Sequence, residues 1–382
     1  MGQQKIHILH LLSWAPTPEN PTLGNFCFRH INSLPENCES VVLMTEVGNG
    51  VRVEPSMHYT LVVVGVKNSS CKLLRKWREW RAYQQGLSYV KKHLFLPDIV
   101  HLHVAMPLGR VALFWKKRFD LPYVVTEHWT GYQPQNRHSL SMRKLWLTRW
   151  IAREAKRVLP VSRDLQHCMQ DCGISANYEV IYNVVDTSVF TPKTLNHSEK
   201  MKILHISTLR DDAKNFSGIL RVVKQLSQQR TDFELNVIHD YAAPHFENYV
   251  RQHNLNGFVH FLGQHPMSEV ANSYRQSDFL LLFSNFENLP CVIVEAFASG
   301  LPVVSSDVGG IAEIVNPERR ILVPAGDEVA LLNAMNNMLD HVRDYSAEKI
   351  RAYAEQQFSP QVIGSQIQTV YSQSIAVTDI KI

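Results

Sequence analysis

The segment 279–315 combines two acidic side chains with the expected start of a helix. It reads as an apolar strand over 279–283, a short loop, and a helix that begins near Pro290. Glu287 lies in the loop, and Glu295 follows in the second helical turn. Backbone N–H groups at a helix start bind phosphate, and carboxylates on either side accept hydrogen bonds from hydroxyl groups. A sugar, a diphosphate and a ribose bound in series would match this arrangement.

These residues also have a plainer interpretation. Glu287 by itself could be a solvated loop residue. Glu295 stands within the apolar sequence VIVEAFASG, and a buried carboxylate needs partners, so a structural salt bridge is the alternative. Asn288 fits the position of a helix cap just before Pro290.

Patterns that bind metal or perform redox chemistry are scarce. The six cysteines form no CxxC pair, and the sequence has neither an HExxH nor an Asp-x-Asp motif. Cys168 and Cys172 stand one helical turn apart, which is more typical of two semi-buried residues. His101 and His103 would share one strand face, but without a third ligand such residues more often pack and hydrogen-bond in place. We therefore expect no metal site and a reduced compartment.

Short apolar runs that alternate with helical patterns must position these residues. The runs show little polar alternation, as expected for strands buried on both faces. A first set of strands is predicted over 6–12, 40–45, 59–66, 99–104, 123–126, 157–161 and 178–181. A second set is predicted over 202–208, 234–239, 259–262, 279–283, 303–305 and 321–323. Helical stretches such as 141–154 and 216–230 lie between them, which indicates doubly wound α/β domains with parallel sheets.

The polar segment 186–200 separates the two sets of strands. It reads DTSVFTPKTLNHSEK, with a proline and no sustained period. We expect one domain over 1–190 and a second over 191–359, followed by a helix over about 360–382. Ligands of open α/β sheets bind outside the carboxyl ends of the strands, so we expect the site in a cleft between the domains.

The composition is that of a globular protein with full-sized cores. The 382 residues are 45% hydrophobic and 19% charged, which excludes a disordered scaffold, a collagen-like fibre and a disulfide-stapled small domain. A net charge of +4 is too small to indicate nucleic-acid binding. The sequence shows no cleavable leader and no apolar run of about 18 residues. We therefore expect a cytoplasmic protein.

Basic residues gather between positions 67 and 120. Trp77, Trp80 and Trp115 are interleaved with them, and Trp146 and Trp150 follow in another basic helix. Basic residues together with tryptophan suit a surface that touches anionic lipid headgroups. The alternative is a solvated helix face whose aromatic side chains lie in the core, and the sequence leaves both interpretations open.

The segment around Glu287 and Glu295 resembles the glutamate-x7-glutamate signature of glycosyltransferase family 4, which are retaining enzymes of the GT-B fold. The resemblance extends over nearly the whole chain. The other segments that carry it are PTLGNFCF at 21–28, PDIVHLHVAMPLG at 97–109, LPYVVTEHWTGY at 121–132, VLPVSRDL at 158–165, VIYNVVDTSVF at 180–190 and LHISTLRDDAKN at 204–215. It implies two Rossmann-like domains facing a central cleft, with 360–382 crossing back to the first, acceptor-side domain.

The resemblance also implies roles for individual residues. Arg210 and Lys214 would neutralise the diphosphate of a nucleotide-sugar donor. Glu295 would bind the ribose hydroxyls, and Glu287 would bind hydroxyls of the donor sugar. The donor is then a co-substrate, and no further cofactor is implied.

Further donor contacts are implied on both sides of the transferred sugar. His128 would lie beside this sugar, and Gly24 with Asn25 would let the backbone approach the donor phosphate. The other donor-binding positions implied are Asn288, Leu289, Cys291 and Val292. The acceptor would be a hydroxyl of a glycan or of a lipid-linked sugar, in the synthesis of cell-surface polysaccharide.

Three departures from the family pattern affect these assignments. Pro290 stands where the family often has glycine, and it has no N–H to donate. Arg210 precedes Lys214 by four residues where five is usual. The family's frequent glycine-aspartate-glycine turn is replaced by the sequence at 239–241.

Other functions remain open at this point. The same fold could support a nucleotide-sugar epimerase or, less well, a phosphorylase. A non-catalytic sugar-nucleotide-binding protein need not keep His128, Lys214, Glu287 and Glu295 together. A nicotinamide oxidoreductase is disfavoured because no GxGxxG follows a strand.

Overall fold

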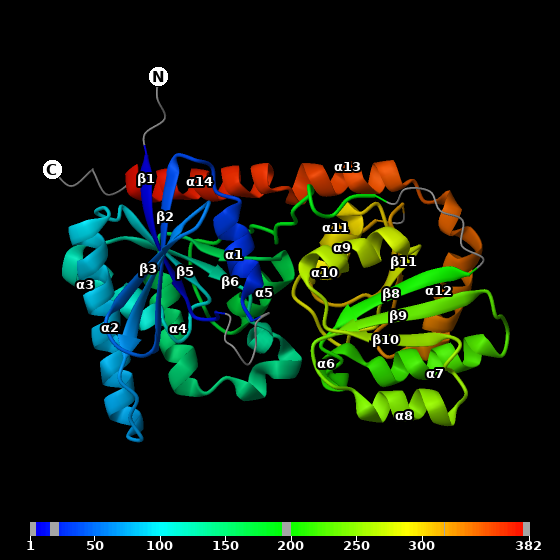
Figure 1. Cartoon of the computed structure of the whole chain (residues 1–382). Coiled ribbons are helices and arrows are strands. Elements are labelled where there is room, and N and C mark those ends of the chain that lie inside the picture. Colours follow the sequence, from blue (N-terminus) through cyan, green and yellow to red (C-terminus); the bar gives the residue numbers. More distant parts are fainter. Residues whose placement is uncertain (1–4, 16–22, 193–199, 317, 377–382) are drawn as a thin grey trace. The chain divides into compact units, whose positions relative to one another are not determined.

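The computed structural model describes residues 5–15, 23–192, 200–316 and 318–376. The start of the expected glycine loop, residues 193–199 of the polar linker and the last residues of the expected C-terminal helix lie outside the described residues. The chain divides into two compact units: unit 1 contains 1–182 and 360–382, and unit 2 contains 183–359. Each unit is built on its own sheet with helices packed on it (Figure 1), which confirms the α/β prediction.

The sheet of unit 1 has seven strands among the described residues, in the order β3-β4-β2-β1-β5-β6-β7. The strands are β1 (Ile6–Leu12), β2 (Cys38–Val47), β3 (Val51–Pro55), β4 (Thr60–Val66), β5 (Ile99–His103), β6 (Tyr123–Glu127) and β7 (Val158–Pro160). All neighbours pair in parallel except β3 and β4. Parallel strands are buried on both faces, and all of β5 and β6 is buried here.

Helices and short 3₁₀ turns connect the strands of unit 1. They are α1 (Asn25–Asn32), α2 (Lys72–His93), α3 (Gly109–Phe119), η1 (Thr130–Tyr132), η2 (Pro134–Ser139), α4 (Met142–Glu154) and α5 (Arg163–Asp171). Ser141 and Ser162 cap α4 and α5, because their side chains accept the N–H groups of Lys144 and Leu165.

The sheet of unit 2 has six parallel strands among the described residues, in the order β10-β9-β8-β11-β12-β13. The strands are β8 (Met201–Ser207), β9 (Phe233–His239), β10 (Val259–Gly263), β11 (Phe279–Leu282), β12 (Val303–Ser306) and β13 (Arg320–Val323). The helices are α6 (Asp211–Lys214), α7 (Phe216–Ser227), α8 (Pro244–Gln252), α9 (Met267–Gln276), α10 (Cys291–Ala298), α11 (Ile311–Ile314), α12 (Glu328–His341), η3 (Val342–Asp344) and α13 (Ala347–Phe358). Because β8 and β11 are neighbours, the loops after them meet at one sheet edge.

The C-terminal helix α14 (Pro360–Ala376) belongs to unit 1, where it packs on α1, β5 and β6 (Figure 1). The Tyr371 hydroxyl lies 2.6 Å from Nδ1 of the buried His101. A Cβ on Gly364 would lie 1.8 Å from the Ser33 carbonyl oxygen, so only glycine allows this approach of α14.

The division between the units falls after Tyr182, earlier than the expected boundary at residue 190. The segment that follows is bonded to the last helix of unit 2. The Val185 N–H donates to the Phe358 carbonyl, and the Arg351 guanidinium donates to the carbonyls of Thr187 and Phe190. These bonds assign the segment to unit 2, although its polarity suggests a linker.

One strand prediction is wrong, and one strand was missed. The apolar stretch at 178–181 forms no strand, and only Tyr178 makes an isolated bridge, to Val158. Conversely, β3 was not predicted. It pairs antiparallel at the sheet edge and is almost entirely exposed, so it lacks the apolar run of a buried strand.

Candidate functional site

The loop after β11 holds Glu287 in a buried position. Its carboxylate forms an ion pair with the Lys214 ammonium. The Ser284 hydroxyl donates to the same carboxylate oxygen at 2.8 Å. Lys214 and Glu287 were predicted as site residues from separate segments, and the structure brings them together. Ser284 was missed, although a hydroxyl three residues before a loop carboxylate is a recognisable signal.

Lys214 reaches Glu287 because two loops are fastened to each other. It ends the short helix α6, which follows β8. Asn285, in the loop after β11, donates its backbone N–H to the Ala213 carbonyl at 2.8 Å and its side-chain amide to the Asp212 carbonyl at 3.0 Å. The adjacency of β8 and β11 therefore creates the Lys214–Glu287 pair.

Arg210 does not join this pair. It occupies the N-cap position of α6, and its guanidinium forms an ion pair of 2.5 Å with Asp212. Its side chain is 65% exposed. The hydrogen bond from Arg210 holds the pKa of Asp212 below its usual value. The predicted pair of phosphate-binding cations thus has Lys214 at the site and Arg210 on the surface.

The helix α10 starts at Cys291 and Val292, with Pro290 in the N-cap position. The expectation that Asn288 caps this helix, with Pro290 inside it, is wrong. Proline at the N-cap has no side-chain acceptor, so the N–H groups at this end receive no side-chain cap. Together with the helix dipole, such an end favours an anion.

Residues 287–289 are held by the backbone around them. The Asn288 carbonyl accepts the Gly310 N–H at 2.7 Å, and the Leu289 carbonyl accepts the side-chain amide of Asn183 at 2.7 Å. Gly309 has a φ of +56°, and a Cβ there would lie 1.8 Å from the Glu287 carbonyl oxygen. Asn183 was not among the predicted site residues.

Glu295 is buried inside α10 and faces a phenol. The Tyr274 hydroxyl of α9 lies 2.9 Å from its carboxylate and 3.0 Å from the Val292 carbonyl. Tyr274 is therefore a partner that the sequence analysis did not name. A carboxylate has several lone pairs, so hydroxyl groups can donate to it as the Tyr274 phenol does.

In unit 1, Gly24, Asn25 and His128 gather where β1 and β6 end. Gly24 has a φ of +74° just before α1, and a Cβ there would lie 2.4 Å from the Trp14 carbonyl oxygen. Asn25 is the first residue of α1. The His128 ring lies 4.1 Å from that of Phe26, centre to centre. The structure therefore brings these three predicted residues together.

His128 is held as a neutral imidazole. Burial, and to a lesser degree the proximity of His30, keeps the pKa of His128 well below its usual value. Near neutral pH one ring nitrogen is thus a donor and the other an acceptor.

Glu127, the last residue of β6, organises this region and was missed by the sequence analysis. Its fully buried carboxylate accepts the N–H groups of His128 and Trp129 at 2.9 Å and that of Ala105 at 3.1 Å. The Tyr132 hydroxyl donates to it at 3.2 Å. Burial raises the pKa of Glu127, and these donors oppose the shift. A carboxylate that ends a buried strand is a signal the sequence did contain.

Three buried histidines, His10, His101 and His103, place ligand atoms within 4.8 Å of one another. The expected pair has a third member because His10 of β1 lies beside His101 of β5. His10 Nδ1 lies 3.2 Å from His103 Nε2, and the nitrogens of His101 contact Tyr371 and Thr126. A metal ion would have to displace these hydrogen bonds.

Both halves of the chain match established protein families. Residues 24–189 match the family profile described as Glycosyltransferase Family 4, and residues 200–341 match the one described as Glycosyl transferases group 1. The unit 2 sheet, the unit 1 sheet apart from β1, and the segments that carry Glu287 and His128 fall inside these matches. The chain therefore belongs to glycosyltransferase family 4, group 1.

Individual relatives extend this result. The chain is 24% identical to a putative teichuronic acid biosynthesis glycosyltransferase, TuaC, of Bacillus subtilis, over 76% of this chain and 75% of the relative. Alignments with curated relatives span 62% to 75% of those relatives' own lengths.

Solved structures of known proteins share the fold. Sucrose-phosphate synthase from Thermosynechococcus elongatus superposes with a TM-score of 0.78 at 18% identity, covering 97% of this chain and 100% of that chain. The Anabaena protein HepE in complex with UDP-glucose gives a TM-score of 0.73 at 18% identity, covering 96% and 100%. This establishes the GT-B fold.

Among the described residues, no helix combines the length and apolar character needed to cross a bilayer.

Proposed function

We propose that this protein transfers a sugar from a nucleotide-diphosphate donor to a hydroxyl of a glycan or lipid-linked acceptor, in cell-surface polysaccharide synthesis. The observation that carries the proposal is the Lys214–Glu287 pair beside the start of α10. A cation, a helix N-terminus and two buried carboxylates suit the diphosphate and hydroxyl groups of such a donor. The UDP-glucose complex of the HepE structure and the teichuronic acid role of the TuaC relative support it.

Each residue has a proposed task. Lys214 and the N–H groups of Cys291 and Val292 offset the charge that develops on the leaving diphosphate. Glu287 binds donor-sugar hydroxyls, and Glu295 binds the ribose. Because Lys214 and the helix end supply positive charge, we propose catalysis without a metal ion.

The family resemblance further suggests retention of configuration at the anomeric carbon. The bond from this carbon to the diphosphate oxygen breaks, and the acceptor oxygen bonds to the same face. The acceptor's proton passes to the departing phosphate, so no protein carboxylate needs to remove it. His128 would contact the transferred sugar, and the backbone at Gly24 would approach the phosphate.

A panel of UDP-, GDP- and ADP-sugars tests the proposal. The purified protein should hydrolyse one donor slowly and transfer its sugar once an acceptor is present, and the matching nucleotide diphosphate should raise the melting temperature. Indifference of the melting temperature to every nucleotide diphosphate would overturn the proposal. Conversion of the donor sugar without transfer would favour an epimerase.

Two glutamate variants separate catalysis from binding. We expect Glu287→Ala to reduce kcat at least ~100-fold with little change in nucleotide affinity, because it removes a sugar contact. Glu295→Ala should instead weaken nucleotide binding by about tenfold or more. Titration calorimetry with the nucleotide diphosphate and initial-rate kinetics measure the two effects. Glu348→Ala, at an exposed position on α13, is the control; normal turnover in both site variants would show that the site is misplaced.

We also propose that the protein acts in the cytoplasm at the inner face of the membrane. The exposed residues Arg75 and Lys76 and the neighbouring Arg78 of α2 would be attracted to anionic lipid. Replacing all three with glutamate should reduce binding to vesicles of phosphatidylglycerol and phosphatidylcholine. Unchanged binding would mean that this helix is only a solvated face.

A further inference from the structure

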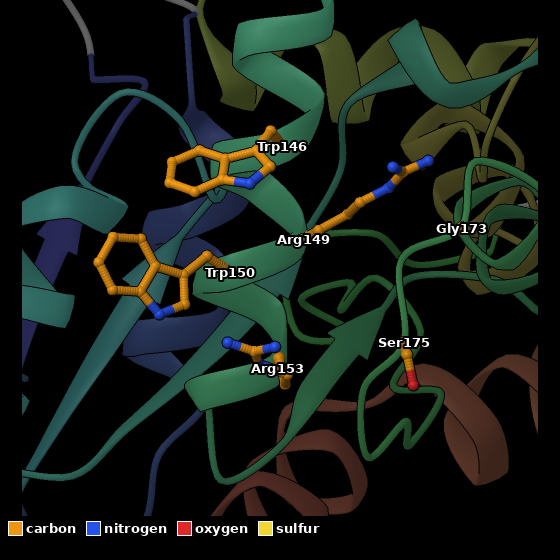
Figure 2. Close-up of a pocket in the computed structure, with 6 residues that line it drawn as sticks. All are labelled: Trp146, Arg149, Trp150, Arg153, Gly173 and Ser175. Carbon is orange, nitrogen blue, oxygen red and sulfur yellow. The ribbon is translucent and has the colours of Figure 1, made fainter.

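The described part of unit 1 carries a surface pocket of about 380 Å³, and none of its lining residues is assigned to the donor. Figure 2 shows its lining, with Trp146, Arg149, Trp150 and Arg153 projecting from α4. Gly173 and Ser175, which follow α5, form the opposite side. Aromatic and cationic side chains thus alternate along one side of a single helix.

The tryptophans of unit 1 differ in their exposure to solvent. Trp115 is fully buried in the core, as the solvated-face interpretation requires. Trp146, by contrast, is 63% exposed, and its ring centre lies 5.6 Å from that of Trp150. Met142, one turn earlier, is also exposed. Large apolar side chains that are exposed to solvent at the rim of a pocket indicate a surface that a binding partner covers.

The cations at this pocket are not neutralised by neighbouring carboxylates. Arg149 is fixed in place, because its guanidinium donates to the Cys172 carbonyl at 2.6 and 3.1 Å. Arg153 is exposed and makes no ion pair with another described residue. The nearby carboxylate of Glu154 is already paired with Lys116 at 3.0 Å. The pocket therefore favours an anion.

The combination of aromatic and basic side chains continues on the neighbouring helices α2 and α3. Lys117 of α3 lies over the Trp150 ring at 4.3 Å. Trp80 of α2 contacts Phe114 of α3, with ring centres 5.0 Å apart. Exposed apolar side chains along this row are Leu73, Trp77, Phe114, Phe119 and Trp146. A small soluble anion would use only the pocket, whereas a bilayer would cover the whole row.

We propose that the α4 pocket binds the phosphate of an anionic lipid headgroup, while Trp146 enters the interfacial layer of the bilayer. This rests on the membrane contact of the proposed function and specifies its anchor. Arg149 and Arg153 match phosphate oxygens, and an indole is the side chain that membrane interfaces favour. The basic α2 helix attracts the membrane from a distance, and the α4 pocket holds it at contact.

Vesicle flotation with the full-length protein tests this proposal. Vesicles of phosphatidylglycerol and phosphatidylcholine are compared with vesicles of phosphatidylcholine alone, without donor or acceptor. The variant Trp146→Ala/Arg153→Glu should bind the anionic vesicles about tenfold more weakly. A matched control, Val329→Ala/Arg343→Glu, removes an exposed apolar side chain and reverses one exposed arginine in unit 2, and it should bind as the wild type does.

The salt dependence of vesicle binding and the quenching of tryptophan fluorescence distinguish insertion of Trp146 from charge attraction alone. At about 0.5 M salt the wild type should keep more binding than Trp146→Ala, because burial of an indole is not screened. Lipids with a quencher in the upper acyl chain should quench the wild type more than Trp146→Phe. Equal binding of the pocket variant and the control, or equal quenching, would overturn the proposal.

The same measurements also test a different class of ligand for this pocket, a soluble glycan. Should a soluble uronic-acid oligosaccharide change the tryptophan emission while the vesicles do not bind, the pocket is a glycan site and the lipid proposal fails. Because no step needs turnover, these results stay independent of the donor panel. The pocket variants should keep the wild-type rate of donor hydrolysis.

Discussion

At the scale of single residues, Glu127 fixes the turn that carries His128. Glu127→Gln should lower stability by about 2–3 kcal/mol, because an amide NH₂ would then face a backbone N–H group in place of a carboxylate oxygen. It should also raise KM for the donor through displacement of His128. Chemical denaturation and initial rates measure the two effects.

The control for this variant is Glu36→Gln, at an exposed position. It should change neither quantity. If Glu127→Gln unfolded at the wild-type denaturant concentration and bound donor normally, the carboxylate would have no positioning role.

At the scale of elements, the loops after β11 and β12 depend on one glycine. Gly309→Ala should reduce turnover by ~10-fold or more, because a Cβ cannot fit beside the Glu287 carbonyl and the backbone is in the left-handed region. The displaced loop would release the Gly310–Asn288 hydrogen bond and change the position of Glu287.

Gly257→Ala provides the comparison, because a Cβ there has no atom within 4 Å. We expect it to keep its activity. Initial-rate kinetics of the two variants measure the change in turnover, at a temperature at which thermal melting shows both variants to be folded. Normal turnover in Gly309→Ala would mean that the two loops do not act together.

At the scale of the whole molecule, unit 1 should be acid-sensitive. Burial holds the pKa of His10, His30, His101, His103 and His128 below 6.5, and that of His30 falls to about 4. Between these pH values the unfolded chain binds more protons than the folded chain, so stability falls as the pH decreases from about 6.5. The loss is about 1.4 kcal/mol per pH unit for each histidine that titrates in this way.

In an acid titration, unit 1 should therefore unfold at a higher pH than unit 2. Among the described residues, unit 2 has one histidine with a comparably lowered pKa, His205. All seven tryptophans lie in unit 1, so their emission reports unit 1, while circular dichroism reports both units. As the pH is lowered, the change in tryptophan emission should therefore have its midpoint at a higher pH than the change in circular dichroism. His30→Gln should flatten the pH dependence by about 1.4 kcal/mol per unit; coincident transitions would contradict this prediction.

Much of the fold could be predicted from the sequence because buried parallel strands leave continuous apolar runs. β1 was predicted at its observed bounds, Glu287 and Glu295 were singled out by their types and spacing, and Lys214 was named through the family resemblance. The edge strand β3 and the segment at 178–181 were not assigned correctly, because pairing at a sheet edge depends on neighbours and not on local hydrophobicity.

The sequence by itself thus determined the family, the α/β class and the residue types at the site. Only the tertiary structure decided their partners. It joined Lys214 to Glu287, turned Arg210 toward Asp212, brought His10 to His101 and placed Glu127 beneath His128. The physical reason for the Lys214–Glu287 and His10–His101 contacts is that the order of strands in each sheet brings together residues that are distant along the chain.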